Sequence, residues 1–446
     1  VFQTARSGDA GGPDTTIIEA LNQARRHYEE SPEEDPVLQA EIGTALAEVF
    51  ADNQGMDTAR ELLTEVLALR EKNLGPNHLK TAQTLRRLGD AMWLKDEDPA
   101  AIGYVERALE IFRRHEEVGG MQLADALNSY ALMLTRAGRP AEAGKAFEET
   151  LGLLRHERPG PEAQLAIANA SESYAGLLLG QGRIAEAAER VRDSMEVKCR
   201  LARGLPNPGC SMSRLNLSIV LARLGRYGEA EKLARSSVEI ETRLYGADSR
   251  RAADARCTLG DHLSGARRFE EAEQELRDSV TDLAAAIGPA SPVTAKCRDS
   301  FANALLRSGK GAEAEDQARE ALRDLRAAYG SVNRRVIFAR DHVAGAIRAE
   351  GRLADAEAEF RAALEEGEQA LGKDHPSLAL LRHDLAELLA DQGRADEAAP
   401  LAEAALAARR KSLGDEHPVT LATAALLERI RVLPGASAES TPVASR

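Results

Sequence analysis

Two histidines of this chain stand beside an aspartate, and histidine with a carboxylate is a common pair in general acid–base catalysis. They form the dipeptides Asp341-His342 and His383-Asp384. Both dipeptides lie in the middle of segments with helical periodicity, and neighbouring residues on a helix do not face each other. We therefore expect neither dipeptide to act as a catalytic dyad.

The four cysteines are the other residues that could do chemistry. Cys199, Cys210, Cys257 and Cys297 include no Cys-x-x-Cys pair, so a structural zinc site is not expected. Cys199 and Cys210 flank one loop and could meet as a disulfide, but we favour a reduced, part-buried pair. Since no nucleophile, base or ligand set is clustered, the sequence predicts no catalytic residue, no metal site and no cofactor.

A six-residue phrase that returns along most of the chain sets the positions of these residues. It reads Gly-Arg-Ala-Asp-Glu-Ala at residues 393–398, and each copy ends on an alanine. Successive closing alanines are 42 to 44 residues apart. They are Ala59, Ala101, Ala143, Ala187, Ala230, Ala272, Ala314, Ala356 and Ala398. A fixed period of this size is typical of a helical solenoid, which grows by stacking units.

Each unit predicts two helices joined by a tight turn, and we call them helix A and helix B. Apolar residues recur at helical spacing from Leu378 onward, and Gly393 ends that helix A in a left-handed conformation. Loops of the type Leu-Gly-x-x-His follow several B helices. We expect their histidines, which are His78, His375 and His417, to cap helix ends rather than bind a metal.

The repeat count gives the domain organisation. We expect an N-terminal extension and lead helix over residues 1–34, with Asp14 as the helix N-cap. Residues 35–433 form the solenoid, with nine antiparallel helix pairs and then a lone capping helix. Residues 434–446 are rich in Ser, Ala and Pro and are expected to be a disordered tail. The chain begins at Val1 rather than Met, so we interpret it as a piece of a longer protein.

Composition excludes some classes of function. The 446 residues are 43% hydrophobic and 29% charged but only 4% aromatic, which is typical of long helices packed through small side chains. The formal net charge of −14 disfavours a general nucleic-acid or anionic-membrane surface. No apolar run reaches the ~18 residues that a membrane span needs.

The helix pairs anchored by Gly and Ala resemble tetratricopeptide repeats. Their 42-residue period and Leu-Gly-x-x-His-Pro loops are similar to the long-repeat subtype of kinesin light chains and many bacterial proteins. The resemblance covers about residues 37–431. It implies an all-α, right-handed superhelix in which helix A lines a concave groove, and a role in binding proteins or peptides.

The N-terminal residues carry a narrower resemblance. Residues 1–3, 15–21 and 35–40 resemble the segment that joins the membrane helix to the repeats in certain bacterial receptor-type serine/threonine kinases. This resemblance implies an extracytoplasmic sensor or docking domain. The chain itself contains no kinase motif, and a cytoplasmic location stays open as the alternative.

In each repeat we count back along helix A from the glycine that opens the six-residue phrase. This count gives the side chains that should line the groove. The candidates for partner binding are Glu41, Glu48, Asp90, Asp125, Asn128, Asn169, Met212, Leu215, Ile219, Asp254, Asp261, Asp299, Asn303, Asp341 and His383. Acidic residues dominate both flanks, and the middle is more apolar. Such a groove suits an extended or helical segment that carries basic residues and an apolar anchor. The alternative is that a chain of this charge shows acids on every face.

The sequence therefore predicts a non-catalytic protein- or peptide-binding scaffold. The second hypothesis is the sensor or docking domain of a bacterial serine/threonine kinase. A third, an enzyme built on a helical toroid, is disfavoured because no catalytic side chains cluster in the sequence. We expect a protein or peptide partner with basic residues, no nucleic acid and no membrane insertion. The sequence predicts no oligomeric state.

Overall fold

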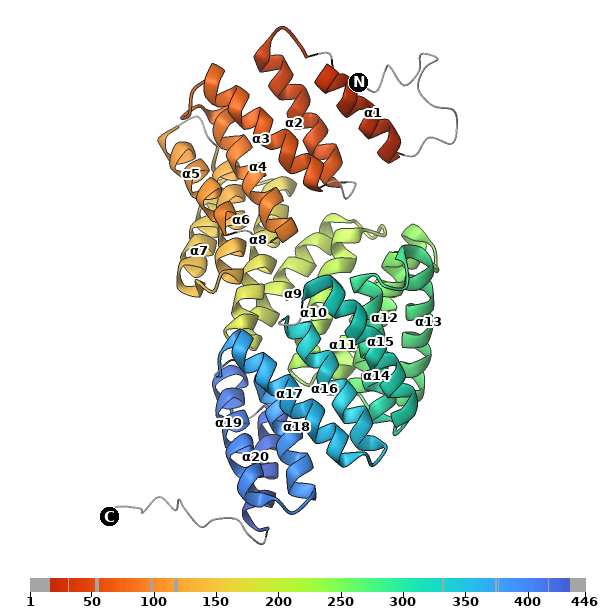
Figure 1. Ribbon diagram of the computed structural model, residues 1–446. Coiled ribbons are helices and arrows are strands. Elements are labelled where there is room, and N and C mark those ends of the chain that lie inside the picture. Colours follow the sequence, from red (N-terminus) through yellow and green to blue (C-terminus); the bar gives the residue numbers. More distant parts are fainter. Residues whose placement is uncertain are drawn as a thin grey trace, which may run out of the picture. The chain divides into compact units, whose positions relative to one another are not determined.

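The computed structural model describes residues 17–30, 32–52, 56–96, 99–115, 119–330, 333–373, 375, 377–415 and 417–433. Within these ranges the chain forms twenty helices and no strand (Figure 1). The all-α prediction is confirmed. The predicted N-cap Asp14, the N-terminal extension and the tail over 434–446 lie outside the described residues.

The chain divides into two compact units, Val1–Leu177 and Leu178–Arg446. The helices of unit 1 are α1 (Ile17–Glu30), α2 (Pro36–Asp52), α3 (Met56–Asn73), α4 (Leu79–Asp96), α5 (Ala100–Arg114), α6 (Gly120–Arg136) and α7 (Pro140–His156). Helix α8 (Pro161–Gly180) spans the boundary between the units. In unit 1 the pairs α2–α3, α4–α5 and α6–α7 pack as the predicted A–B hairpins.

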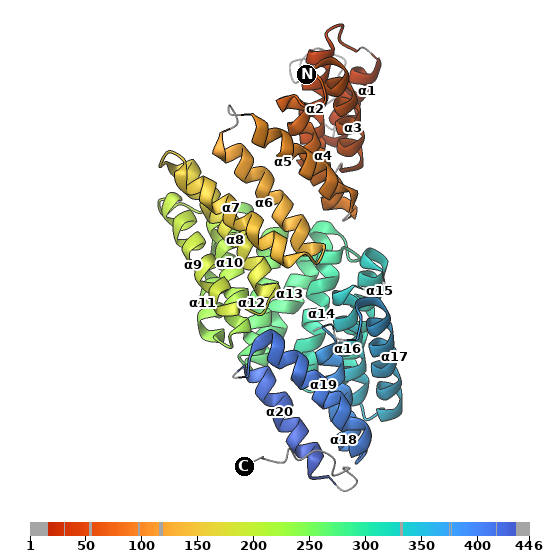
Figure 2. The ribbon, with the colours of Figure 1, turned by 90° about the vertical axis from the view of Figure 1, so that its left-hand side faces the viewer.

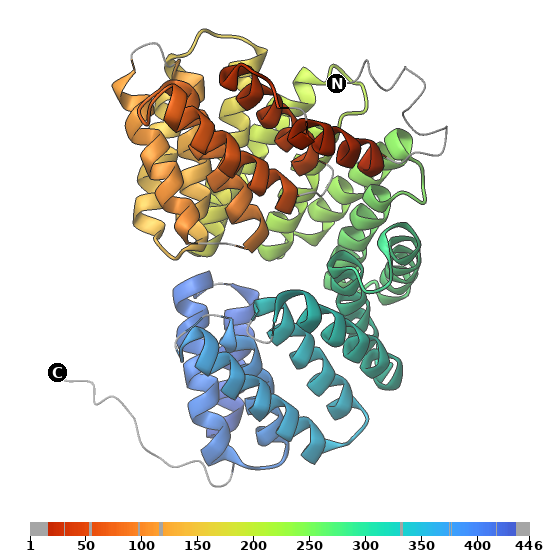
Figure 3. The ribbon, with the colours of Figure 1, turned by 45° about the horizontal axis from the view of Figure 1, so that its top comes forward.

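Unit 2 continues the same alternation of A and B helices. Its first six helices are α9 (Ile184–Leu201), α10 (Pro208–Arg223), α11 (Tyr227–Tyr245), α12 (Arg250–Gly265), α13 (Phe269–Ile287) and α14 (Pro292–Arg307). The remaining six are α15 (Gly311–Tyr329), α16 (Arg334–Ala349), α17 (Leu353–Leu371), α18 (Leu378–Asp391), α19 (Ala395–Leu413) and α20 (Pro418–Arg431). Each even-numbered helix from α10 to α18 packs against the helix after it, and α20 follows as the predicted lone helix. Figures 2 and 3 show these C-terminal helices, in blue, lying side by side.

Unit 2 curves toward its A helices. Consecutive A helices touch along the series α10, α12, α14, α16, α18 and α20, whereas the B helices of the described chain make fewer contacts with one another. Helices that approach each other more closely lie on the inside of a curved stack. The A-helix face of unit 2 is therefore concave, as the resemblance implied. The right-handed sense of the superhelix stays a prediction.

The turn between helices A and B explains the glycine of the repeated phrase. Gly393 has a φ of 76°, and the next amide, Arg394 N–H, donates back to Leu389 O at 3.0 Å. This left-handed residue closes the helix and satisfies its last carbonyls. Arg267 occupies the glycine position of another repeat and still has a φ of 65°. The repeat phase therefore survives at residues 267–272, where the phrase has lost its glycine.

The arginine of the phrase joins consecutive repeats. Arg394 lies 2.6 Å from Glu357 of the preceding helix B and 2.8 Å from Glu397 in its own helix. Arg352 repeats the pattern with Glu315 at 2.9 Å. In both cases the arginine pairs with the glutamate that directly follows the closing alanine of the preceding repeat. Such exposed ion pairs are individually weak, but here they recur in register along unit 2.

The closing alanines allow neighbouring repeats to pack closely against each other. All nine are at most 1% exposed, and Ala356 packs in a core cluster with Leu385 and Phe360. The core is therefore a series of thin layers between adjacent units. A small side chain at this position lets two helices approach, so the alanine is a packing requirement.

The histidine loops behave as predicted. His78 Nδ1 accepts from Lys80 N–H at 3.1 Å, and His417 Nδ1 accepts from Val419 N–H at 3.2 Å. His375 caps helix α18 in the same way through Ser377 N–H at 3.2 Å. Each ring nitrogen satisfies an otherwise unpaired amide at a helix start.

The expectation of reduced thiols is wrong. Cys199 and Cys210 form a disulfide, since the end of α9 and the start of α10 bring their Cα atoms within 4.7 Å. A second disulfide, which the sequence analysis missed, joins Cys257 of α12 to Cys297 of α14, with Cα atoms 5.8 Å apart. Both separations lie in the range that disulfides need. The second bond links two consecutive A helices because the two cysteines occupy nearly equivalent places in adjacent repeats.

Candidate functional site

The predicted binding residues divide between the two units. Glu41 and Glu48 lie on α2, Asp90 on α4, Asp125 and Asn128 on α6, and Asn169 on α8. Met212, Leu215 and Ile219 lie on α10, Asp254 and Asp261 on α12, Asp299 and Asn303 on α14, Asp341 on α16, and His383 on α18. The second group belongs to one compact unit, so its geometry is considered as a whole.

The acids of unit 1 are neutralised by basic neighbours. Glu41 lies 2.9 Å from both Arg70 and Lys80, and the hydrogen bond from Lys80 is the largest cause that lowers the pKa of this carboxyl. Arg86 lies 2.8 Å from Asp90 and 3.3 Å from Asp125. The predicted acidic flank of unit 1 therefore carries little unbalanced charge.

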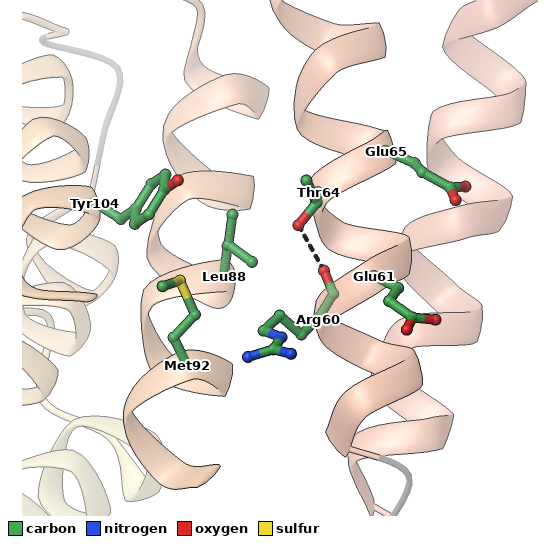
Figure 4. A pocket seen from close by; sticks show the side chains of 7 residues that line it. All are labelled: Arg60, Glu61, Thr64, Glu65, Leu88, Met92 and Tyr104. Atoms are coloured by element: carbon green, nitrogen blue, oxygen red, sulfur yellow. Dashed lines mark hydrogen bonds between the residues drawn. The ribbon is translucent and has the colours of Figure 1, made fainter. Parts of the chain in front are cut away.

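Two depressions lie in unit 1. One, of about 200 Å³, is lined by Phe112 of the B helix α5 and by five residues of the A helices α4 and α6, which are Gln83, Arg86, Arg87, Gln122 and Asp125. The other, of about 450 Å³, lies between α3, α4 and α5 (Figure 4). In it Leu88, Met92 and Tyr104 face Arg60, Glu61, Thr64 and Glu65 across the opening. Both are shallow surface features, and neither gathers groups for catalysis.

The apolar middle of the predicted groove is present on α10. Met212 is 50% exposed and Ile219 is 38% exposed, whereas Leu215 is buried. The neighbouring residues Ser211 and Ser218 are small and buried, so the two large side chains project from a helix that is otherwise closely packed. An exposed methionine is an adaptable contact for an apolar side chain of a partner.

The acids of unit 2 have different partners from those of unit 1. Asp299 Oδ1 on α14 lies 2.7 Å from His342 Nδ1 on α16. Burial opposes protonation of His342, but the nearby carboxylates of Asp299, Asp341 and Asp384 outweigh it and raise its pKa to about 9. The imidazole is therefore cationic at neutral pH and forms an ion pair across two repeats.

Asp341 faces another carboxyl rather than a base. Burial and the charge of Asp384 on α18 raise the pKa of Asp341 well above its usual value, and Asp341 donates a hydrogen bond to Asp384. Burial also raises the pKa of Asp384 to about 6. The two groups therefore share a proton at neutral pH. The remaining oxygen of Asp341, Oδ1, is buried without a hydrogen-bond partner.

His383 does not form a dyad with the aspartate beside it. Its Nε2 lies 4.0 Å from Asp384 Oδ1, and burial lowers the pKa of the imidazole to about 4. His342 likewise hydrogen-bonds Asp299 rather than the adjacent Asp341. Neither histidine therefore hydrogen-bonds the aspartate beside it in the sequence. The partner of His342 lies one repeat away instead.

A contact distant in sequence joins the two ends of unit 2. His417 Nε2, in the loop before α20, lies 2.6 Å from Arg223 O at the end of α10. A Cβ built on Gly182 would lie 1.9 Å from Ser412 O, and one on Gly225 would lie 3.7 Å from Pro418. The first turns of unit 2 and its last loop therefore meet.

Comparison with known proteins gives the family. A tetratricopeptide-repeat model matches residues 37–114, 210–283 and 337–411, which together make up just over half of the chain. A second tetratricopeptide-repeat model matches residues 294–344. The chain belongs to the tetratricopeptide-repeat family.

Solved structures agree with this tetratricopeptide-repeat (TPR) fold. The apo form of the quorum sensor NprR from B. thuringiensis has a TM-score of 0.54 at 14% identity and covers 69% of this chain and 82% of its own. Aspartyl phosphate phosphatase F from Bacillus subtilis has a TM-score of 0.52 at 10% identity, with coverages of 79% and 89%. BtubC (BKLC) from P. vanneervenii is 19% identical over 52% of this chain and 92% of its own, with a TM-score of 0.44. No curated protein matches the chain.

Several features of the TPR chain could not be read from one repeat. His262 on α12 is buried against Ser218 on α10, with its Nε2 2.9 Å from the hydroxyl, and burial lowers its pKa to about 4. The ion pair of His342 and the carboxyl pair of Asp341 also span two repeats. Reading equivalent positions of successive repeats together is the signal that could have found them. In the described part of the chain, no three His, Cys, Asp or Glu residues are placed to hold a metal ion, and no helix has the length and apolarity for crossing a bilayer.

Proposed function

We propose that this TPR protein is a non-catalytic scaffold that holds a segment of a partner protein against the concave A-helix face of unit 2. The partner segment carries basic residues and an apolar anchor. One observation carries the proposal: the exposed Met212 and Ile219 lie on the same concave face as Asp254 and Asp261. An apolar contact flanked by carboxylates complements a short segment with both kinds of side chain.

The difference between the two units supports unit 2 as the binding part. In unit 1 the acids Glu41, Asp90 and Asp125 each have an arginine as an ion-pair partner. In unit 2, Asp299 pairs with a histidine and Asp341 with a second carboxyl. Asp299 is balanced by that histidine, but the Asp341–Asp384 pair has one proton between two acids and keeps one negative charge that is available to a ligand. The fold alone does not select this role, because the solved TPR-like structures include both a quorum sensor and a phosphatase.

A display library of random peptides selected on the 446-residue chain tests the proposal. We expect selected peptides to carry Lys or Arg near an apolar residue. Reversing Asp254 and Asp261 to lysine should weaken their binding by roughly tenfold or more, and salt should weaken binding to the unaltered protein. Selection of acidic peptides, or unchanged binding by the reversed variant, contradicts the proposal.

The matched control makes the same change of charge away from this face. Glu239 on α11 and Glu270 on α13 are exposed on B helices of the same unit. Their reversal to lysine alters the net charge as much as reversal of Asp254 and Asp261 does. We expect the control variant to bind the selected peptides nearly as well as the unaltered protein, since the effect depends on the place of the charge.

The second candidate is the extracytoplasmic domain of a bacterial receptor-type kinase, and the two disulfides support its extracytoplasmic location. Disulfides persist in oxidising compartments and are rare in the cytoplasm, and all four cysteines of this chain are paired. The test is alkylation of the protein in intact cells before and after reduction, read by mass spectrometry. Protection of all four thiols until reduction supports this candidate, and alkylation without reduction removes its support.

A further inference from the structure

Four carboxyls form a ladder across the concave face of unit 2. Asp261, Asp299, Asp341 and Asp384 come from the successive A helices α12, α14, α16 and α18. The charge of Asp299 acts on both Asp261 and Asp341, and Asp341 in turn is hydrogen-bonded to Asp384. Like charges at this spacing repel each other. Asp299 and Asp341 occupy the same position of their repeats, ten residues before the turn glycine, whereas Asp261 and Asp384 come from other positions of the neighbouring A helices.

The charged groups around the ladder leave one part of it unbalanced. His342 on α16 neutralises Asp299, and Arg348 on the same helix lies 2.7 Å from Glu387 of α18 and is also paired with Asp391. On α18, His383 has a lowered pKa and is neutral. These partners are satisfied within the protein, so the Asp341–Asp384 pair is the part whose charge can change.

Two further arginines face this region from the last helices. Arg409 of α19 is buried and donates to Thr423 and to Val419 O of α20, at 3.3 Å for the latter, while its charge acts on Asp384 and Asp341. Arg429 of α20 lies 3.2 Å from Asp391. Arg409 is therefore held by its hydrogen bonds to α20, and Arg429 by its ion pair with Asp391. Neither makes a hydrogen bond to the free oxygen of Asp341.

An unsatisfied oxygen marks the position that a ligand could fill. Asp341 is only 5% exposed, and its Oδ1 has no hydrogen-bond partner. A buried polar atom without a partner costs roughly 1–3 kcal/mol, and such atoms are uncommon in native proteins. His383 Nδ1, on the neighbouring helix, is also buried without a partner. A hydrogen-bond donor that enters here gains both the charge of the pair and the free acceptor.

We propose that Asp341 and Asp384, beside the ion pair of His342 and Asp299, form a subsite that receives one ammonium or guanidinium group, and that this cation replaces the proton shared by the two carboxyls. The inference rests on the proposed function and assigns a place to one basic side chain of the bound segment. With one shared proton, the empty Asp341–Asp384 pair carries one negative charge. When the cation binds, the proton passes to solvent, so the net charge of the pair and its occupant is the same in both states.

The experiment uses the intact chain with isotope-labelled histidine, followed by NMR and by calorimetry in buffers of different ionisation enthalpy. The probe is N-acetyl-arginine methylamide. N-acetyl-citrulline methylamide, which has nearly the same shape without the charge, is its control. At neutral pH we expect the arginine probe alone to shift the His342 and His383 resonances to saturation. We expect binding to release up to about one proton per cation.

Isosteric variants test the residues. Asp341→Asn and Asp384→Asn keep the size of the side chain but cannot exchange a proton for a cation. Each should weaken the arginine probe about tenfold and abolish proton release, while circular dichroism shows the helices intact. Equal shifts with the citrulline probe, or undiminished binding and proton release in Asp341→Asn, overturn the subsite. Spermidine as a third ligand shows whether a free polyamine can supply the cation in place of a peptide side chain.

The two proposals can fail separately. If selected peptides bind and the reversal of Asp254 and Asp261 weakens them, while Asp341→Asn leaves affinity and proton release unchanged, the subsite is wrong and the proposed function stands. If the library yields no basic peptide but the arginine probe saturates with proton release, the subsite stands and the peptide-binding function is wrong.

Discussion

His342 Nδ1 and Asp299 Oδ1 lie 2.7 Å apart although 43 residues separate them in the sequence. The contact joins α16 to α14. The protonation of His342 therefore affects how these two consecutive A helices pack. The carboxyl pair of Asp341 and Asp384 joins α16 to α18 in the same way. A chain of polar contacts therefore runs along the A helices of unit 2, one repeat at a time.

The His342–Asp299 ion pair should make stability fall in alkaline solution. The folded state raises the pKa of His342 to about 9, above the value near 6.5 of an unfolded histidine. Its contribution is therefore full below about pH 6.5 and is lost as the pH rises through 9. Its size is at most roughly 3 kcal/mol. Thermal melts of the unaltered protein and of His342→Gln across this range should converge at high pH, and a constant difference contradicts the assignment.

Asp384 should destabilise the protein once it is ionised. Its pKa is raised to about 6 in the folded state, so its stabilising effect is full below the unfolded value near 3.9 and is lost as the pH rises through 6. In mildly alkaline buffer we expect Asp384→Asn to have a free energy of unfolding up to about 3 kcal/mol larger than that of the unaltered protein. The variant should therefore melt at a higher temperature. The exposed Asp316→Asn on α15 is the control and should show no such pH-dependent gain. A lower melting temperature for Asp384→Asn in that buffer contradicts the raised pKa.

The closing alanines should not accept a larger side chain. Ala356 on α17 is fully buried between two repeats, so Ala356→Leu should destabilise the protein by about 1–3 kcal/mol through overpacking. Ala354 lies two residues away in the same helix and is exposed, so Ala354→Leu should have little effect. Denaturant unfolding of both variants checks this, and equal stabilities contradict the role of Ala356 in repeat packing.

The meeting of the two ends of unit 2 can be tested with a pair of glycines. Gly182 and Gly309 both have a positive φ, of 76° and 83°, so alanine at either should cost about 1 kcal/mol in backbone strain. Only Gly182 also approaches Ser412. We expect Gly182→Ala to destabilise more than Gly309→Ala and to speed hydrogen exchange around residues 412–420. Identical effects of the two substitutions count against the contact.

Repeat architecture could be predicted from the sequence because each unit states it again. Gly393, the closing alanines and the capping histidines each follow from local chemistry that recurs every 42 to 44 residues. The bridge from Arg394 to Glu357 was missed although the Ala-Glu dipeptide is visible in the sequence. The bridge depends on how two consecutive repeats pack, because the spacing of their B helices decides which side chains meet.

The binding face was harder to predict, because a projection from one helix gives position without partners. The counting rule placed Asp90 and Asp299 in the same class, yet Asp90 pairs with Arg86 of its own helix and Asp299 with a histidine of the next repeat. The disulfide of Cys257 and Cys297 was missed for the same reason. Only the approach of neighbouring A helices decides which of these residues touch.

Hydrogen exchange of the intact chain, with and without a peptide selected from the library, tests the central claim most directly. The account predicts that the peptide slows exchange in the A helices of unit 2, above all in α10, α12, α14 and α16, and leaves unit 1 and the outer faces of the B helices unchanged. Protection confined to unit 1 or to the B helices of unit 2 would contradict the claim that the concave face of unit 2 is where this protein holds its partner.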